Sequence, residues 1–203
     1  MELNPLKIPI STMAGIAGVL IFLALLIAAM ARFPDGFSPL TNWISDLGNT
    51  SLNPDGASYF NAACLITGVL MLFYYLGFYL WYTRELWRNA LVILGQLAGA
   101  LSGIALILVG IYPEIYASPH YLWSFVYFLS SLGALILINA GLFTHLLYDN
   151  ITAYCGLAAI AVTLVFVAGQ VLGIEQPVFE WLSVGLALLW ATFAALNTYK
   201  RFT

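Results

Sequence analysis

Residues 38–49 read SPLTNWISDLGN, a polar stretch that interrupts an otherwise apolar sequence. Ser38 can cap free N–H groups, Pro39 suits the first position of a helix, and Gly48 suits the left-handed position just past its end. Two faces alternate at helical spacing between these signals, an apolar one of Leu40, Trp43, Ile44 and Leu47 and a polar one of Asn42, Ser45 and Asp46. The stretch predicts a short amphipathic helix, lying on the membrane surface or folded back into a bundle.

The rest of the chain is too apolar for a fold surrounded by water. Of its 203 residues, 63% are hydrophobic and 7% are charged, and the mean hydropathy is +0.96. A water-exposed domain of this size could not bury so much apolar surface, so we expect the chain to lie in a lipid bilayer. The net charge of −3 is small and scattered, which excludes nucleic acid as a partner.

Six apolar segments are long enough to span a membrane. No small-residue cleavage motif follows the first segment, so it is interpreted as a transmembrane helix and not as a signal peptide. The spans are expected at about 8–31, 57–82, 89–111, 119–147, 153–173 and 178–199. The sequence thus predicts an all-α membrane protein, a single six-transmembrane helix bundle that covers residues 1–203.

The basic residues predict the orientation. One side of a six-span arrangement carries Lys7, Arg84, Arg88, Lys200 and Arg201, and the other side carries Arg32. By the positive-inside rule, both termini are cytoplasmic and the loop with the predicted amphipathic helix is extracytoplasmic. We expect a multi-pass protein of the cell membrane.

A row of small residues lies on one face of the third span. Gly95, Gly99 and Gly103 form a GxxxGxxxG pattern that allows two helix backbones to approach closely. The partner is a neighbouring helix of the same chain or, alternatively, a second copy across a dimer interface. Membrane lipid is an expected partner in either case, and a homodimer or a role as accessory subunit of a larger complex stays open.

One group of polar residues can meet near the predicted extracytoplasmic face. The second, fourth and sixth spans all begin there, so three helix N-termini present their positive ends. The group consists of Asn42, Ser45, Asp46, Asn61, Glu114, His120 and Glu180. Together they predict a polar pocket for a lipid headgroup or a small anionic ligand. Taken singly, each residue is better explained as a helix cap or a solvated side chain.

The same residues offer limited chemistry. His120 with Asp46 or Glu180 is a candidate acid–base pair, so Asp46 and His120 are the catalytic candidates. Ser45, Ser118 and Ser124 are nucleophile candidates only by proximity, because no GxSxG elbow exists. An oxygen-rich metal set of Asp46, Glu114, His120 and Glu180 has no HxxxH or HExxH pair to support it. The sequence therefore assigns no metal, leaves the cofactor unknown and leaves enzymatic activity open.

Several short motifs together resemble a known family. They are Ile44-Ser45-Asp46-Leu47-Gly48, the pair Phe60-Asn61, the segment Val109–Glu114 and the following His120, with Gly173 and Glu180-Trp181 as a further polar element. The chain resembles the prokaryotic membrane family known as domain of unknown function 998, although Tyr112 stands where that family more usually has Phe. The resemblance implies a six-span fold and implies no activity. Its motif residues coincide with the polar group described above.

Two functions remain at this point. The first is an integral membrane protein whose outward-facing pocket binds, and in one version acts on, a lipid headgroup or small anionic ligand. The second is a non-enzymatic scaffold or accessory subunit whose polar cluster only holds the loop in place. Transport is less favoured, because no span has paired Gly/Pro breaks or a charge at mid-membrane. Gln96 and Gln170 are the main polar groups within the spans, and Gln170 could bond a neighbouring helix.

Overall fold

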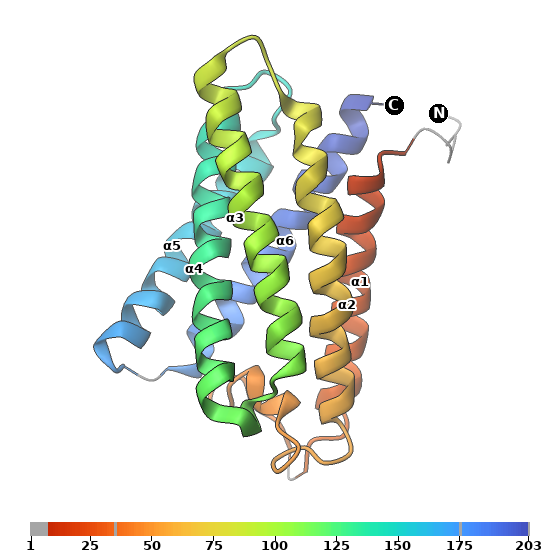
Figure 1. Cartoon of the computed structure of the whole chain (residues 1–203), viewed down its shortest axis with the longest axis vertical. Helices are drawn as coiled ribbons and strands as arrows, with labels where there is room; N and C mark the ends of the chain where they lie inside the picture. Colours follow the sequence, from red (N-terminus) through yellow and green to blue (C-terminus); the bar gives the residue numbers. More distant parts are fainter. Residues whose placement is uncertain (1–7, 35, 175, 203) are drawn as a thin grey trace.

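A computed structural model describes residues 8–34, 36–174 and 176–202. Figure 1 shows long helices standing side by side, namely α1 (Ile10–Met30), α2 (Ala57–Leu76), α3 (Leu86–Ile111), α4 (Ala117–Leu142), α5 (Asn150–Leu172) and α6 (Pro177–Phe202). These 6 helices are long and apolar enough to cross a membrane, and the described residues form no strand. The prediction of an all-α fold with six helices long and apolar enough to span a membrane is confirmed.

The helices form a ring. Each helix packs against the next one in sequence, and α1 packs against α6, which closes the ring. Helix α1 begins and α6 ends at the same end of the bundle, which we call the termini end (Figure 1). Residues 36–56 lie at the opposite end, which we call the loop end. Helix α5 leans away from α4 as it approaches the loop end (Figure 1).

The glycine row of α3 is used within the chain. Gly95 faces Ile138 of α4, so closely that a Cβ atom there would lie 2.5 Å from its side chain. Gly99 lies against Tyr75, and Gly103 lies against the backbone of Gly68. All three glycines of the row are buried. The interpretation of this row as a dimer interface is therefore wrong, and close packing inside one chain explains it.

The predicted loop helix is largely wrong. Residues 39–41 form a turn, and helical structure is confined to a short 3-10 helix, η2 (Ser45–Gly48). Gly48 does not take the left-handed conformation, which among the described glycines occurs at Gly36 and Gly173. Gly48 is instead required by space, since a Cβ atom there would lie 2.5 Å from Asn61 Oδ1. The side chain of Leu40 is 74% exposed and does not join an apolar face.

The loop nevertheless folds back into the bundle, as one of the two alternatives expected. Ile44 is 5% exposed and Leu47 is fully buried, and both pack with Phe22 and Phe60 in the core of the loop end. Asn53 fixes the far side of the loop, because its Nδ2 donates to the carbonyl oxygens of Ala29 (3.2 Å) and Leu47 (3.0 Å). The loop is thus part of the wall of the bundle.

Helix α4 ends at Leu142, earlier than the expected end near residue 147. The cause is Tyr148, whose side chain turns back into the core and donates a hydrogen bond of 3.0 Å to Asn139 Oδ1. A helix continued to this point could not place that hydroxyl group inside the bundle.

Candidate functional site

Three of the predicted site residues hold the loop in its shape. Asp46 Oδ2 accepts hydrogen bonds from Asn42 Nδ2 (3.2 Å) and from the Trp43 amide (3.0 Å). Asn61, in the first turns of α2, donates from Nδ2 to the carbonyl oxygen of Gly48 (3.1 Å). These contacts are local ties between polar side chains and backbone, and they give Asn42, Asp46 and Asn61 a structural role.

Glu180 connects α6 to the same loop. It lies in the first turn of α6, its side chain is only 6% exposed, and its Oε2 accepts a hydrogen bond of 2.7 Å from the Ile44 amide. The next residue, Trp181, donates from Nε1 to the carbonyl oxygen of Asn42 (3.0 Å). A buried carboxyl group without a partner is costly, so the Ile44 amide explains part of how Glu180 is accommodated.

Glu114 and His120 lie across from Glu180. Glu114 belongs to a short 3-10 helix, η4 (Glu114–Tyr116), and its Oε2 accepts a hydrogen bond of 3.1 Å from Asn49 Nδ2. His120 is 2% exposed in the first turn of α4. Its Nδ1 lies 2.9 Å from the carbonyl oxygen of Tyr112, so Nδ1 carries a proton and donates it. His120 Nε2 is buried and has no hydrogen-bond partner among the described residues.

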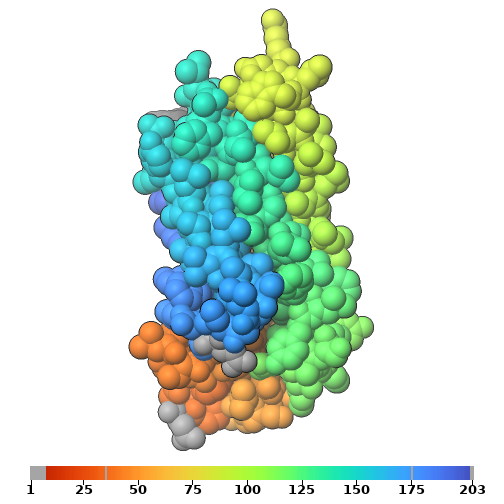
Figure 2. Space-filling view, turned by 90° about the vertical axis from the view of Figure 1, so that its left-hand side faces the viewer, coloured from red at the N-terminus to blue at the C-terminus, as the bar shows by residue number. Residues whose placement is uncertain are grey.

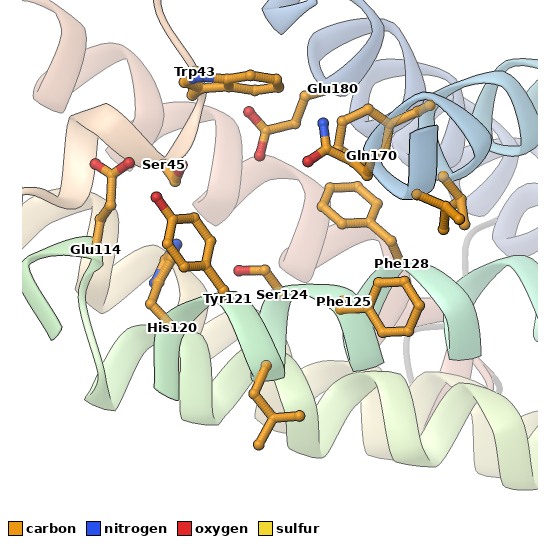
Figure 3. A pocket seen from close by; sticks show the side chains of 14 residues that line it. Trp43, Ser45, Glu114, His120, Tyr121, Ser124, Phe125, Phe128, Gln170 and Glu180 are labelled. Carbon is orange, nitrogen blue, oxygen red and sulfur yellow. The ribbon is translucent and has the colours of Figure 1, made fainter. Parts of the chain in front are cut away.

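A cleft of about 540 Å³ lies between these residues, bounded by the loop, η4, α4, α5 and α6. Four of the predicted site residues line it, namely Ser45, Glu114, His120 and Glu180. Figure 3 shows the polar ends of Glu180, Gln170 and Ser124 turned toward one space, with the ring of Trp43 above them. Asn42, Asp46 and Asn61 do not line the cleft. The helix N-termini of α4 and α6 contribute to its wall, whereas that of α2 does not.

The mouth of the cleft is apolar and opens on the outside of the bundle. Leu122 and Phe125 of α4 are 56% and 44% exposed, and Val171 of α5 is 70% exposed, although all three line the cleft. Figure 2 shows this face, where α5 in blue runs beside α4 in green and ends above the orange loop. The cleft therefore joins a polar interior to a surface that faces the hydrocarbon region when the six helices span a membrane.

Acidic side chains gather at the cleft. The carboxyl groups of Asp46, Glu114 and Glu180 are close enough to interact electrostatically with one another. Among the described residues that line the cleft, none is Lys or Arg. Arg32 is directed elsewhere, since its Nη1 donates to the carbonyl oxygen of Ala28 (3.0 Å) and its guanidinium lies over the ring of Tyr59.

No hydrogen bond joins His120 to Asp46 or Glu180 in the described part of the chain, although His120 and Glu180 line the same cleft, and the acid–base pair stays a prediction. His120 bonds to a backbone carbonyl, and Asp46 is occupied by the loop and does not line the cleft. Of the nucleophile candidates, Ser45 and Ser124 line the cleft and Ser118 does not. Among the described residues, no group of three or more His, Cys, Asp or Glu side chains could hold a metal ion.

Sequence reasoning missed most of the lining. The aromatic part of the wall consists of Trp43, Tyr121, Phe125, Phe128 and Phe166. A signal was present, because His120, Ser124 and Phe128 recur at intervals of four and so share one face of a helix. Gln170 is a second signal, since a polar amide near the end of an apolar span needs a partner or a cavity.

The comparison with known proteins agrees with the motifs. A family model described as Protein of unknown function (DUF998) matches residues 16–197. This range runs from within α1 to within α6 and includes the loop and every residue that lines the cleft. No curated protein and no solved structure matches the chain. The chain therefore belongs to the DUF998 family of membrane proteins.

Proposed function

We propose that this protein binds a membrane lipid, with the polar head of the lipid in the cleft and its acyl chains leaving between α4 and α5. The observation that carries the proposal is the continuity between a polar interior and an apolar mouth in one cleft. An amphipathic molecule matches both parts at once, whereas a small polar ligand would have to pass an apolar mouth.

The depth of the cleft supports a ligand that comes from the bilayer. Its lining residues Phe128 and Phe166 lie inside the spans α4 and α5, and their rings pack edge to face at 4.6 Å. These rings supply an apolar part of the lining at the depth of the spans. Its exposed margin, with Leu122 and Val171, would be in contact with acyl chains.

The proposed orientation places the cleft on the outer side of the cell membrane. Arg84 and Arg88 lie in and next to the α2–α3 connection, and Lys200 and Arg201 lie at the end of α6, all at the termini end. By the positive-inside rule, this end is cytoplasmic and the loop end is extracytoplasmic. Lys7, which the sequence analysis also used, lies outside the described residues.

A scaffold role is the second candidate, and a specific observation favours it. Asp46, Asn53 and Asn61 all form hydrogen bonds with backbone groups of the loop. Polar residues at this end therefore stabilise the loop. A pure scaffold would need these contacts and would have no use for bound lipid. The two candidates therefore differ in what fills the cleft.

A matched pair of substitutions on α5 tests the proposal. Val171 lines the cleft and is 70% exposed, whereas Val165 is 51% exposed on the same helix and does not line it. Val171→Trp should fill the mouth of the cleft with an indole ring, and Val165→Trp should add the same ring to a lipid-facing surface. Native mass spectrometry of gently extracted protein would count the lipids that remain bound.

We expect wild type and Val165→Trp to retain a lipid that Val171→Trp loses, with all three equally stable to heat. Equal lipid content in the two variants would contradict a lipid site in the cleft. A protein free of lipid in all three forms would favour the scaffold role and direct attention to partner proteins.

A further inference from the structure

His120, which lines the cleft, has a hydrogen-bond acceptor that no described residue uses. Because Nδ1 donates to the Tyr112 carbonyl, the neutral ring carries its lone pair on Nε2. That atom is buried, without a partner, on a side chain that lines the cleft and is 2% exposed. A buried polar atom in this state costs free energy unless a ligand or water satisfies it. Its natural partner is a group that donates a hydrogen bond.

The other polar groups around the cleft can form further hydrogen bonds, some as acceptors and some as both donors and acceptors. Glu180 uses one carboxyl oxygen for the Ile44 amide, and a carboxylate has about four lone-pair sites, so it can accept more bonds. The hydroxyl groups of Ser45 and Ser124 and the amide of Gln170 can each donate and accept. A ligand group that both donates and accepts would satisfy all of these side chains.

The lining offers no counter-charge to an anionic head. The described lining contains no Lys or Arg that could balance a phosphate, which would also lie near the carboxyl groups of Glu114 and Glu180. The sequence-based expectation of an anionic ligand relied on helix N-termini alone, and the acids oppose it. A cationic ammonium head fits the acids but can only donate, so it would leave the donors of Gln170 and the serines unmatched.

We propose that the lipid bound in the cleft carries an uncharged head rich in hydroxyl groups, such as a sugar, that donates hydrogen bonds to His120 Nε2 and Glu180. This inference rests on the proposed function and names the lipid class for the same cleft. The hydroxyl groups of such a head also accept bonds from Ser45, Ser124 and Gln170. No Lys or Arg is needed to hold it.

A competition between two lipids tests the head group. Lipid-depleted protein is mixed in detergent with equal amounts of monoglucosyl dioleoylglycerol and dioleoylphosphatidylglycerol, which share their acyl chains and both carry hydroxyl groups. Native mass spectrometry then measures the ratio of the two bound lipids. We expect the glucolipid to be favoured about tenfold, since the phosphate finds no counter-charge and displaces hydrogen bonds.

Glu180→Gln keeps an oxygen for the Ile44 amide but replaces the other carboxyl oxygen with an amide nitrogen that can only donate. It should lower the glucolipid preference about fivefold. Glu85→Gln, an exposed acid at the termini end, is the matched control and should leave the ratio unchanged. If Glu180→Gln does not fold, Ser124→Ala makes the same test by removing one hydroxyl group, and it should also lower the ratio.

The outcomes separate this inference from the proposed function. A wild-type protein that retains both lipids equally, or retains phosphatidylglycerol preferentially, would overturn the uncharged head, while lipid binding stands if Val171→Trp abolishes it. A ratio that neither Glu180→Gln nor Ser124→Ala changes would also overturn it. A wild-type protein that binds neither lipid would remove the proposed function together with this inference.

Discussion

One buried polar network near the termini end and the polar lining of the cleft are built in different ways. The network consists of neutral groups that bond to one another: Trp190 Nε1 donates to the Tyr148 hydroxyl (3.1 Å), which donates to Asn139 Oδ1 (3.0 Å). Asn139 Nδ2 then donates to the carbonyl oxygen of Ala153 (3.0 Å). In the cleft at the loop end, the lining residues Glu180 and His120 are ionisable, and in the described part of the chain His120 Nε2 has no partner.

We infer from this difference that the termini-end network stabilises the fold, whereas the cleft binds a ligand. The termini-end network is closed, so removing any member leaves buried groups unpaired and destabilises the fold. The rings of Phe78 and Trp190 stack beside this network with centroids 6.1 Å apart and belong to the hydrophobic core. The loop end keeps a cleft of about 540 Å³ and unused acceptors. We expect the termini end to govern stability and the cleft to govern ligand content.

The largest effect on stability is expected for Trp190→Ala. The side chain is 1% exposed, and its removal would leave a cavity and break the bond to Tyr148. Thermal unfolding in detergent should show a loss of about 3–5 kcal/mol, while the protein that remains folded keeps its lipid. Trp87→Ala, at a position 54% exposed, is the control and should unfold like wild type. Similar melting temperatures for both variants would show that the termini end does not govern stability.

A smaller effect is expected for Asn53→Ala, which tests a structural contact at the loop end. Asn53 is fully buried, and its loss leaves the carbonyl oxygens of Ala29 and Leu47 without this donor. The expected loss is about 2 kcal/mol in thermal unfolding. Because the loop supplies one wall of the cleft, bound lipid should fall as well. The exposed Asn150→Ala serves as control. Unchanged lipid content in a destabilised Asn53→Ala would show that the cleft does not depend on the loop.

The smallest effect is a pH dependence at the termini end. Burial, followed by repulsion from Arg201 and Arg88, lowers the pKa of His145 below its usual value. The folded state thus favours the neutral ring, whose Nδ1 accepts a hydrogen bond from the Leu147 amide. This contribution is fully present above the unfolded pKa of about 6.5 and is lost as the pH falls below it.

Melting temperatures measured at neutral and mildly acidic pH would check this prediction. The fall in melting temperature from neutral to mildly acidic pH should be larger for wild type than for His145→Asn. A variant that loses as much stability as wild type in acid would show that His145 makes no such contribution.

The sequence predicts the spans because span length and hydropathy are local properties. The sequence also predicts that Ser45, Glu114, His120 and Glu180 lie at one end of the bundle. The position of a residue within or beside a span fixes its depth in the membrane. Four of the seven predicted site residues line the cleft for this reason. The family motifs agree with the family model over residues 16–197.

The rest depends on contacts between distant parts of the chain. Glu180 and the Ile44 amide are 136 positions apart, and this bond shapes the loop against its helical pattern. The inward turn of Tyr148 likewise depends on Asn139, and it ends α4 early. The cleft lies between α4, α5 and α6, on the side where α5 leans away from α4 (Figure 1). Helical spacing within one segment carries no information on such an angle.

The most direct test of lipid binding is a crystal structure of the protein grown in a lipid phase that contains monoglucosyl diacylglycerol brominated in its acyl chains. The anomalous signal of bromine would locate the chains independently of the protein model. We predict bromine peaks between α4 and α5, beside Leu122 and Val171, with the sugar next to Glu180 and His120. A cleft filled by its own side chains, with bromine spread evenly around the bundle, would contradict the account.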